Sequence, residues 1–594
     1  MSFKNINATQ AKNNNELLNE SERNDTLLGL DAKTSTFTKS FTQATTFNSG
    51  KLIPILCQEV YPGDTYDINA QTSIKLSAPA STPFNKIIYD VSYFFVPYEQ
   101  IDKEFHHVMG ENDEMGAIDS FIPFPTLKLD VNTSVSTFSY TENDLGNYFN
   151  IPINVNLIGT IEHLNIYPYL AYIKIWNDYF RDQNLQNTAD YTSWYDLPNR
   201  QITDLTTDGK TFYETLKLGK GLAPASKLAD YFTTTLPYRQ KGAPIQLGGT
   251  DSLVLKPLVV ENSKVAYPDF EIFTPIWHKF DKLLLNDRGT LSNWNQGSGK
   301  LGTQLIPSAP AGDGTAAYLS LSTRETKDPF ISGGAFDVNA FRESVRAQQY
   351  LENLALMGSR YVEQLKSIWK IDINPLEIGR AQCIGGFSDT LVFNNVQQTS
   401  ETTASNQLGK IASSLYNQVN GEGFSFSGEQ HGLIIGILVV RTPLNYGAQG
   451  LPKIFSYKEG LDLFNPIFNG LGEQPILNQE IYLKEKALEK NKETFGFNEP
   501  FLNTKYNISN ANGFLSLNSK TSLFSNFLYG EKLTDTPVLS DKYIQYDPNI
   551  IGNTLFKVDN SNIEFYHQFL ALIEFDITYT TEQPLFDVPG IHKV

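Results

Sequence analysis

The sequence has 594 residues, of which only 19% are charged, and 65 acidic against 47 basic residues give a formal net charge of −18 at pH 7. Because neutralising phosphate needs a basic surface, this balance argues against a protein that coats nucleic acid unaided. Two cysteines, Cys57 and Cys383, exclude a cysteine-rich secreted scaffold or zinc site and leave one disulfide open. The most apolar run, Gly432 to Val440, is far short of the ~20 residues of a membrane helix, so no membrane insertion is expected.

The composition favours a protein built from strands. Aromatic residues reach 12%, and they accompany 41 glycines and 29 prolines, a mixture typical of strands joined by turns and long loops. The low charged fraction indicates that partner subunits cover part of the surface.

Residues 1–48 are rich in Asn, Thr and Ser, with Phe37, Phe41 and Phe47 near the end of the segment. This pattern predicts a polar N-terminal arm whose aromatic side chains need a partner surface. The alternative for the first 30 residues is a disordered tail.

Three strands are predicted early in the remaining segment, 49–594. Residues 52–57 are apolar and interrupted by Pro54, which suits an edge strand. Residues 65–76 alternate loosely, and residues 87–96 place four apolar side chains on one face, namely Tyr89, Val91, Tyr93 and Phe95.

Helices and a long insertion are predicted in the middle of the chain. Pro168 suits the first turn of a helix with one apolar face, formed by Tyr169, Tyr172, Ile173, Trp176 and Phe180. A longer apolar stripe predicts a helix over 339–369, which Gly358 would break or bend. Between them, residues 243–325 lack periodicity and are rich in Gly, Pro, Ser and Asn, as expected of a large insertion.

Strands return at the end of the chain. The run 432–440 predicts a fully buried strand, and residues 569–579 alternate with a period of two. The proline-containing tail, 583–594, cannot continue a ladder and must wrap over another surface. Early and late strands that pair across so long a gap predict a mainly β fold, either a Greek-key sandwich or a jelly roll with insertions.

A search for catalytic or metal-binding motifs finds no complete constellation. Gly299-Lys300 is followed by Leu301 instead of the hydroxyl residue that a phosphate-binding loop requires. The segment from Asp204 to Asp208 resembles the start of a calcium loop, but its closing glutamate would fall on Thr215. His106 and His107 are adjacent, so their side chains diverge.

Isolated polar residues leave weaker candidates. A glycosidase-like carboxylate pair stays open among Asp182, Glu429, Glu473 and Glu480, although solvated or ion-paired acids explain them as well. Arginines close to aromatic residues could stack on bases of single-stranded nucleic acid, but we favour subunit boundaries; they are Arg181, Arg342, Arg346, Arg360, Arg380 and Arg441. We therefore predict no catalytic, cofactor-binding or metal-binding residues, and no DNA-contacting residue is identified.

Several segments, in order, resemble the major capsid proteins of microviruses, specifically the gokushovirus-like branch. They are Phe47–Thr65, Val91–Pro97 (VSYFFVP), Trp176–Gln186 (WNDYFRDQNLQ), Asp230–Pro237 with Gln240–Gly242, Arg360-Tyr361, His431–Gly436, Leu471–Tyr482 and Val588–Gly590. The segment containing Phe-Arg-Asp-Gln-Asn-Leu-Gln is the most distinctive. The chain departs from the family at Pro237-Tyr-Arg239, where Pro-Trp-Pro is usual, and at 200–227 and 243–327.

The resemblance implies an eight-stranded antiparallel jelly roll with long loop and helical insertions, and a structural role without enzymatic activity or cofactor. It implies about 60 copies in a small icosahedral shell around circular single-stranded DNA. It also implies scaffolding, DNA pilot and small basic DNA-binding proteins as partners, assembly in the host cytoplasm, and residence in the virion. Residues 243–325 are the candidate protrusion for a host surface receptor.

An alternative from another class is a β-sandwich carbohydrate-active enzyme or binding module. It predicts a monomer that binds sugar and that depends on one carboxylate. The ordered family segments and the low charged fraction favour the capsid interpretation.

Overall fold

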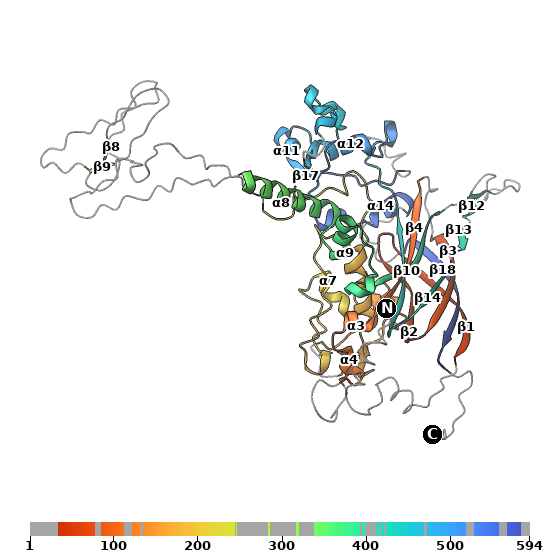
Figure 1. Cartoon of the computed structure of the whole chain (residues 1–594). Coiled ribbons are helices and arrows are strands. Elements are labelled where there is room, and N and C mark those ends of the chain that lie inside the picture. Colours follow the sequence, from red (N-terminus) through yellow and green to blue (C-terminus); the bar gives the residue numbers. More distant parts are fainter. Residues whose placement is uncertain are drawn as a thin grey trace, which may run out of the picture. The chain divides into compact units, whose positions relative to one another are not determined.

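The computed structural model describes residues 34–77, 85–111, 122–130, 135–243, 245, 283–285, 317–319, 338–391, 395–397, 411–414, 417–420, 423–468, 472–517, 528–556 and 567–583 (Figure 1). The chain forms two compact units. One combines residues 1–239 with 354–594, and the other consists of residues 240–353.

The first unit contains an antiparallel sheet that joins the two ends of the described chain. Strand β18 (Phe569–Thr581) lies between β1 (Ser35–Phe47) and β3 (Thr65–Leu76). The other edge of β3 pairs with two short strands, β13 (Asn417–Asn420) and β14 (Phe424–Ser427). Residues more than 500 positions apart in sequence are therefore neighbours in the sheet, such as Phe47 and Phe569.

A second antiparallel sheet has the strand order β10-β4-β15-β2. Its strands are β10 (Gln382–Leu391), β4 (Ile87–Pro97), β15 (Gly432–Arg441) and β2 (Ile53–Val60). Strand β2 lies at the edge, which confirms the position predicted from Pro54. The strands predicted at 65–76, 87–96 and 432–440 are also confirmed.

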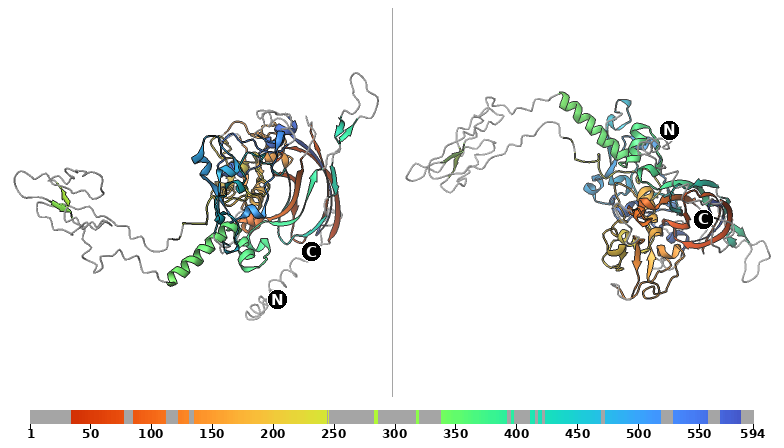
Figure 2. Two further views of the ribbon diagram at one scale, coloured as in Figure 1. Left: turned by 90° about the horizontal axis from the view of Figure 1, so that it is seen from above. Right: turned by 60° about the horizontal axis from the view of Figure 1, so that its bottom comes forward.

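The two sheets pack against each other through aromatic side chains. The ring centroids of Tyr93 on β4 and Phe424 on β14 lie 4.7 Å apart, and those of Phe95 and Phe426 lie 4.8 Å apart. Side chains from both sheets belong to one hydrophobic core. The fold is thus mainly β with stacked antiparallel sheets, which is compatible with the predicted jelly roll (Figure 2).

Strand β18 follows the predicted period of two. Every second side chain from Phe569 to Ile577 is buried, whereas Leu570, Leu572, Glu574 and Asp576 are exposed. Alternation places one face of the sheet on the core and the other outside it.

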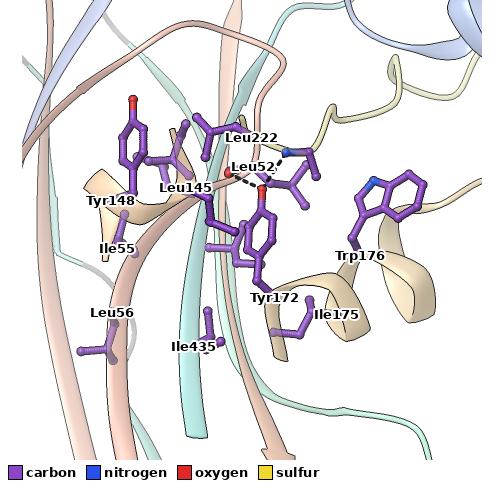
Figure 3. Close-up of a cluster of buried hydrophobic side chains, with 14 of the residues drawn as sticks. Leu52, Ile55, Leu56, Leu145, Tyr148, Tyr172, Ile175, Trp176, Leu222 and Ile435 are labelled. Carbon is purple, nitrogen blue, oxygen red and sulfur yellow. Dashed lines mark hydrogen bonds between the residues drawn. The ribbon is translucent and has the colours of Figure 1, made fainter. Parts of the chain in front are cut away.

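Strand β15 is instead buried on both faces, because a second layer covers the four-stranded sheet. Helix α6 (Tyr167–Ile175) lies against β4 and β15, and all of its side chains except that of Pro168 are buried. Pro168 occupies the first turn, as predicted. The hydroxyl of Tyr172 donates to the carbonyl of Leu52 (2.8 Å) and accepts from the N–H of Ala223 (2.9 Å), and these bonds tie the helix to the residue before β2 and to the segment around residue 223 (Figure 3). The sequence predicts one apolar face for this helix, whereas in the structure its side chains are buried on all sides.

The first unit also contains short helices, short strands and single helical turns. The helices are α3 (Tyr98–Ile101), α4 (Phe105–Val108), α5 (Leu145–Tyr148), α7 (Phe212–Thr215), α9 (Tyr361–Gln364), α10 (Asn478–Ile481), α11 (Leu488–Lys492), α12 (Leu502–Lys505), α13 (Asp541–Ile544) and α14 (Asn549–Ile551). The short strands are β5 (Thr126–Lys128), β6 (His163–Asn165), β7 (Gln201–Ile202), β11 (Asn395–Gln397), β12 (Ile411–Ser414), β16 (Gln474–Leu477) and β17 (Thr494–Asn498). Single 3₁₀ or π turns are η1 (Trp176–Phe180), η2 (Pro198–Arg200), η3 (Leu216–Leu218), η4 (Leu365–Trp369), η5 (Pro375–Ile378), η6 (Lys453–Ser456), η7 (Gly460–Asp462), η8 (Pro466–Phe468), η9 (Gly513–Leu515) and η11 (Gly552–Phe556).

Part of the predicted N-terminal arm is a strand. Residues 35–47 form β1, and the aromatic side chains of this segment stack on β18: Phe37 on Tyr579, Phe41 on Phe575 and Phe47 on Phe569. The partner surface that these side chains need is therefore supplied by the same chain. Residues 1–33 lie outside the described residues, so the arm remains a prediction there.

The predicted helix over 339–369 is divided. Helix α8 (Val338–Met357) ends before Gly358, whose φ of +95° is a conformation that glycine adopts without strain. Helix α9 and the π turn η4 follow. In the second unit, β8 (Leu283–Leu285) pairs with β9 (Ala317–Leu319), and the rest of the insertion 243–325, apart from residues 243 and 245, lies outside the described residues, as does the tail from residue 584.

Replacing Ile573 by alanine tests the core. Ile573 is fully buried in the central strand of its sheet, so Ile573→Ala should lower the free energy of unfolding by about 2–5 kcal/mol. Urea denaturation of the unassembled chain measures this change. The adjacent Leu572→Ala is the matched control, because Leu572 is 42% exposed. Equal losses for the two variants would contradict the assigned faces.

Candidate functional site

The most distinctive segment of the sequence forms a tight polar turn, Arg181–Gln186, directly after η1. The carboxylate of Asp182 accepts hydrogen bonds from the N–H groups of Asn184 (2.7 Å) and Leu185 (2.9 Å). Gln186 closes the turn, because its Oε1 accepts from the N–H of Asp182 (2.8 Å) and its carbonyl accepts from Arg181 Nη1 (2.8 Å). Asp182 is thus a capping residue of the turn.

The Arg181–Gln186 turn connects segments that are distant in sequence. Gln183 Oε1 accepts from the N–H and hydroxyl of Ser359 (3.0 Å each), and Gln183 Nε2 donates to Glu363 (2.6 Å). Gln186 Nε2 donates to Asp541 on α13 (2.9 Å). The turn therefore fixes α9 and α13 against α6 and η1.

Arg360 completes this junction. Its Nη2 donates to the carbonyls of Asn177 (2.8 Å) and Arg181 (3.1 Å), and its Nη1 pairs with Glu363 (3.2 Å). Burial and the nearby Arg360 charge lower the pKa of Arg181, while Asp182 and Glu363 oppose that shift. Two guanidinium groups can lie together here because carboxylates and carbonyl oxygens surround them.

Other arginines also bond within the chain. Arg380 donates to the carbonyl of Asp178 (2.7 Å) and lies 4.1 Å from the ring centroid of Tyr179. Arg441 pairs with Asp90 (2.5 Å). Arg181, Arg360, Arg380 and Arg441 thus have partners within their own chain, and a role at subunit boundaries stays a prediction for them. Of the remaining two, Arg346 donates to Gln349 (3.0 Å), and both Arg342 and Arg346 are exposed.

Glu480, another of the carboxylate candidates, has structural partners. Glu480 accepts from the N–H of Leu477 (3.1 Å) and from the hydroxyl of Tyr231 (3.1 Å), so it caps a helix and binds a buried phenol. Burial and the Glu480 charge raise the pKa of Tyr231. Glu473 is buried and Glu429 is exposed.

The metal-site candidates likewise have structural partners. Lys210 and Thr206 bind Asp204 and hold the pKa of that carboxyl below its ordinary value, so the segment is a turn stabilised by an ion pair. His106 and His107 point to different carboxylates, those of Glu99 and Glu104. In the part of the chain that the structure describes, no group of three His, Cys, Asp or Glu side chains could hold a metal ion. Gly299-Lys300 lies outside that part.

Cys57 and Cys383 lie on opposite edge strands of the four-stranded sheet, β2 and β10. Both belong to one transverse row, because Cys57 faces Ile435, Ile435 faces Phe94 and Phe94 faces Cys383. Three strand spacings of ~4.8 Å separate them by ~14 Å, well beyond the reach of a disulfide. Both thiols are free, so the disulfide left open by the sequence does not form.

A hollow of about 830 Å³ lies on the outer side of the five-stranded sheet. Its lining mixes amides, hydroxyls and aliphatic groups, with Lys75 and Glu574 as its charged members. One cation beside one carboxylate does not make a basic surface, so the hollow provides no electrostatic site for a phosphate backbone.

Two short segments of the first unit each expose several large apolar side chains close together in sequence. The first, called here the 454–467 surface, is made by Ile454 (66% exposed), Phe455 (73%), Leu461 (67%), Leu463 (56%), Phe464 (53%) and Ile467 (83%). The second, the 361–371 surface, is made by Tyr361 (64%), Ile368 (43%), Trp369 (68%) and Ile371 (47%). Clusters of this kind mark interaction sites, whereas single exposed apolar residues do not. Sequence periodicity predicted the stripe of the second surface but not its exposure.

Comparison with known proteins explains these exposed surfaces. Residues 28–591 match the family model described as capsid protein (F protein). The chain belongs to this family of phage capsid proteins. Capsid protein VP1 of Bdellovibrio phage phiMH2K is 29% identical, with 94% of this chain and 95% of the relative covered. Capsid protein VP1 of Chlamydia phage 1 is 25% identical (94% and 96%), and that of Spiroplasma virus 4 is 26% identical (92% and 93%).

Family membership confirms the predicted resemblance and a structural role as major capsid protein, and it supports location in the virion. None of these relatives supports the alternative of a carbohydrate-active enzyme. Among the described residues, no helix has both the length and the apolar character to cross a membrane. A capsid protein assembles in many copies, so part of its surface must be made for other subunits.

Removing the Arg360 side chain tests the junction. Arg360→Met would leave the carbonyls of Asn177 and Arg181 without their charged donor, and we expect a loss of about 1–3 kcal/mol in the free energy of unfolding. Urea denaturation measures the loss. Arg346→Met is the control, because this exposed arginine should contribute less than about 0.5 kcal/mol. A loss for Arg360→Met no greater than that of the control would show that the junction does not stabilise the fold.

His567 should make stability depend on pH. Its Nδ1 lies 2.7 Å from the hydroxyl of Thr46, its Nε2 lies 2.8 Å from Asn143 Oδ1, and burial lowers its pKa. The unfolded chain then binds the proton more readily, so stability falls as the pH drops below the ordinary value of about 6.5. Unfolding free energies at pH 7.5 and 5.5 should differ less in His567→Asn than in the wild type. Identical differences would contradict this assignment.

Proposed function

We propose that this capsid protein assembles into a small closed icosahedral shell of about 60 equivalent copies that encloses circular single-stranded DNA. The observation that carries the proposal is the pair of exposed apolar surfaces on a chain of the capsid family. Many modest contacts between identical copies sum to a stable shell, although no single contact is tight.

The building block of this shell would be an eight-stranded jelly roll. Strands β1, β2, β3, β4, β10, β14, β15 and β18 would be its eight strands in chain order, with β13 extending the edge beside β14. The strand orders β1-β18-β3-β14 and β2-β15-β4-β10 support this assignment. In each sheet a late strand separates two early ones, as two interleaved Greek keys require.

The negative net charge of the chain supports a separate protein that neutralises the DNA inside the particle. With a net charge of −18, the shell cannot neutralise a genome, so a small basic DNA-binding protein would do so. A scaffolding protein and a DNA pilot protein would take part in assembly in the host cytoplasm. The insertion 243–325 would form the protrusion that meets a host surface receptor.

The mass of the natively expressed chain tests this proposal. Sedimentation velocity with negative-stain imaging should find uniform closed particles containing about 60 chains of 66.7 kDa, or ~4 MDa of protein. The experiment is run with and without the co-expressed scaffolding protein, because a shell can depend on its scaffold. A chain that stays monomeric in both arms would contradict the proposal.

A further inference from the structure

The 454–467 surface is held in place by polar groups while its apolar side chains face outwards. Asp462 Oδ2 accepts from the N–H groups of Lys458 (2.7 Å) and Glu459 (3.1 Å), which closes the turn. Tyr457 Oη accepts from Asn503 on α12 (2.9 Å), and the hydroxyl of Ser456 accepts from Gln479 (3.0 Å). The segment thus exposes several large apolar side chains, while hydrogen bonds at its exposed turn and to Asn503 and Gln479 fix its conformation.

The 361–371 surface has the same arrangement. Arg360, Glu363 and the buried Leu365 fix α9 and η4 to the Arg181–Gln186 turn, and this leaves Tyr361 and Trp369 outside. Hydrogen bonds within the chain therefore fix the conformation of both surfaces in the unbound subunit. A partner that binds them would lose little conformational entropy in ordering them.

The two surfaces lie apart on the first unit. Helix α12, which contacts the 454–467 surface through Asn503, is well separated in Figure 1 from α9, which carries the 361–371 surface. One surface therefore does not cover the other within a single chain. Both carry charged residues beside the apolar ones, such as Lys458 and Glu459 on the first and Lys366 and Asp372 on the second, as an interface core with a polar rim requires.

Symmetry dictates how such surfaces pair. A ring of three or five copies needs a heterologous contact, in which one patch of each copy meets a different patch of the next. We propose that the 454–467 surface of one copy binds the 361–371 surface of a neighbouring copy. This inference rests on the proposed shell, and it identifies the two halves of one ring contact.

The exposed area fits this assignment for the 454–467 surface. Large side chains each present on the order of 150–200 Å², so six that are about two-thirds exposed offer on the order of 600–800 Å². A stable interface buries roughly 800 Å² per partner. The four side chains of the 361–371 surface, about 55% exposed on average, offer on the order of 330–440 Å², and their charged neighbours would complete that half of the contact. The 361–371 surface supplies Tyr361 and Trp369, and aromatic residues of these types contribute most to binding at interface centres.

Single substitutions test each half. Phe455→Glu in one surface and Trp369→Glu in the other should each lower the yield of closed particles at least tenfold, because a buried, unpaired carboxylate opposes docking. The unfolding midpoint should stay unchanged, since both side chains are mostly exposed. Met109→Glu is the matched control, because Met109 is 55% exposed and belongs to neither surface.

Mixing the two variants tests whether the halves meet. Phe455→Glu retains an intact 361–371 surface, and Trp369→Glu retains an intact 454–467 surface. Alone, each should sediment as a single chain. At high protein concentration, where a single modest contact is populated, a 1:1 mixture should form dimers and no larger species, because the free surfaces of that dimer are the two altered ones.

Four results would overturn the proposal. Three are particle yields equal to the wild type, as much dimer in either variant alone as in the mixture, and a mixture in which no dimer forms. Loss of particles in Met109→Glu as well would also overturn it, because any added charge would then have the same effect. A wild type that forms no particles with its scaffold contradicts the proposed shell instead, and the dimer test still decides the pairing of surfaces.

Discussion

The four-stranded sheet is buried on both faces, and the rest of the structure depends on this. The five-stranded sheet covers one face and α6 covers the other, so β15 has almost no exposed side chain. Both covering layers come from segments distant in sequence. Strand β18, for example, lies between β1 and β3. The core is therefore complete only when the two ends of the described chain have met.

Outside this two-sheet core, hydrogen bonds between polar groups hold the surrounding segments in place. The Arg181–Gln186 turn, Arg360 and Glu363 fix separate segments with charge-assisted hydrogen bonds. Such bonds are directional, so they set the position of a segment without burying its apolar side chains. The apolar residues of α9 and of the 454–467 surface consequently remain available, and a capsid protein can use them between copies.

The strands were predictable because their signals are local. Alternation in β18 and the uninterrupted apolar run of β15 each allow one placement in a sheet. Strand β1 was only partly recognisable, since Lys39 and Gln43 interrupt the face of the strand that carries Phe37, Phe41 and Phe47. Periodicity there is too weak to separate a strand from a polar arm.

The polar junction and the exposure of the two surfaces could not be predicted. Gln183 and Glu363 are 180 positions apart, and no local pattern links them. Nor does a sequence distinguish an apolar stripe that packs within its own chain from one that awaits another chain. The resemblance to capsid proteins supplied the function, whereas side-chain geometry was needed to show which arginines serve the fold.

A cryo-electron microscopy reconstruction of the assembled particle is the most direct test. The account predicts two-sheet subunits in a closed shell, with Phe455 and Trp369 buried against each other's segments at one contact between copies. A shell in which both side chains face solvent, or in which each meets its own counterpart across a twofold axis, would contradict it.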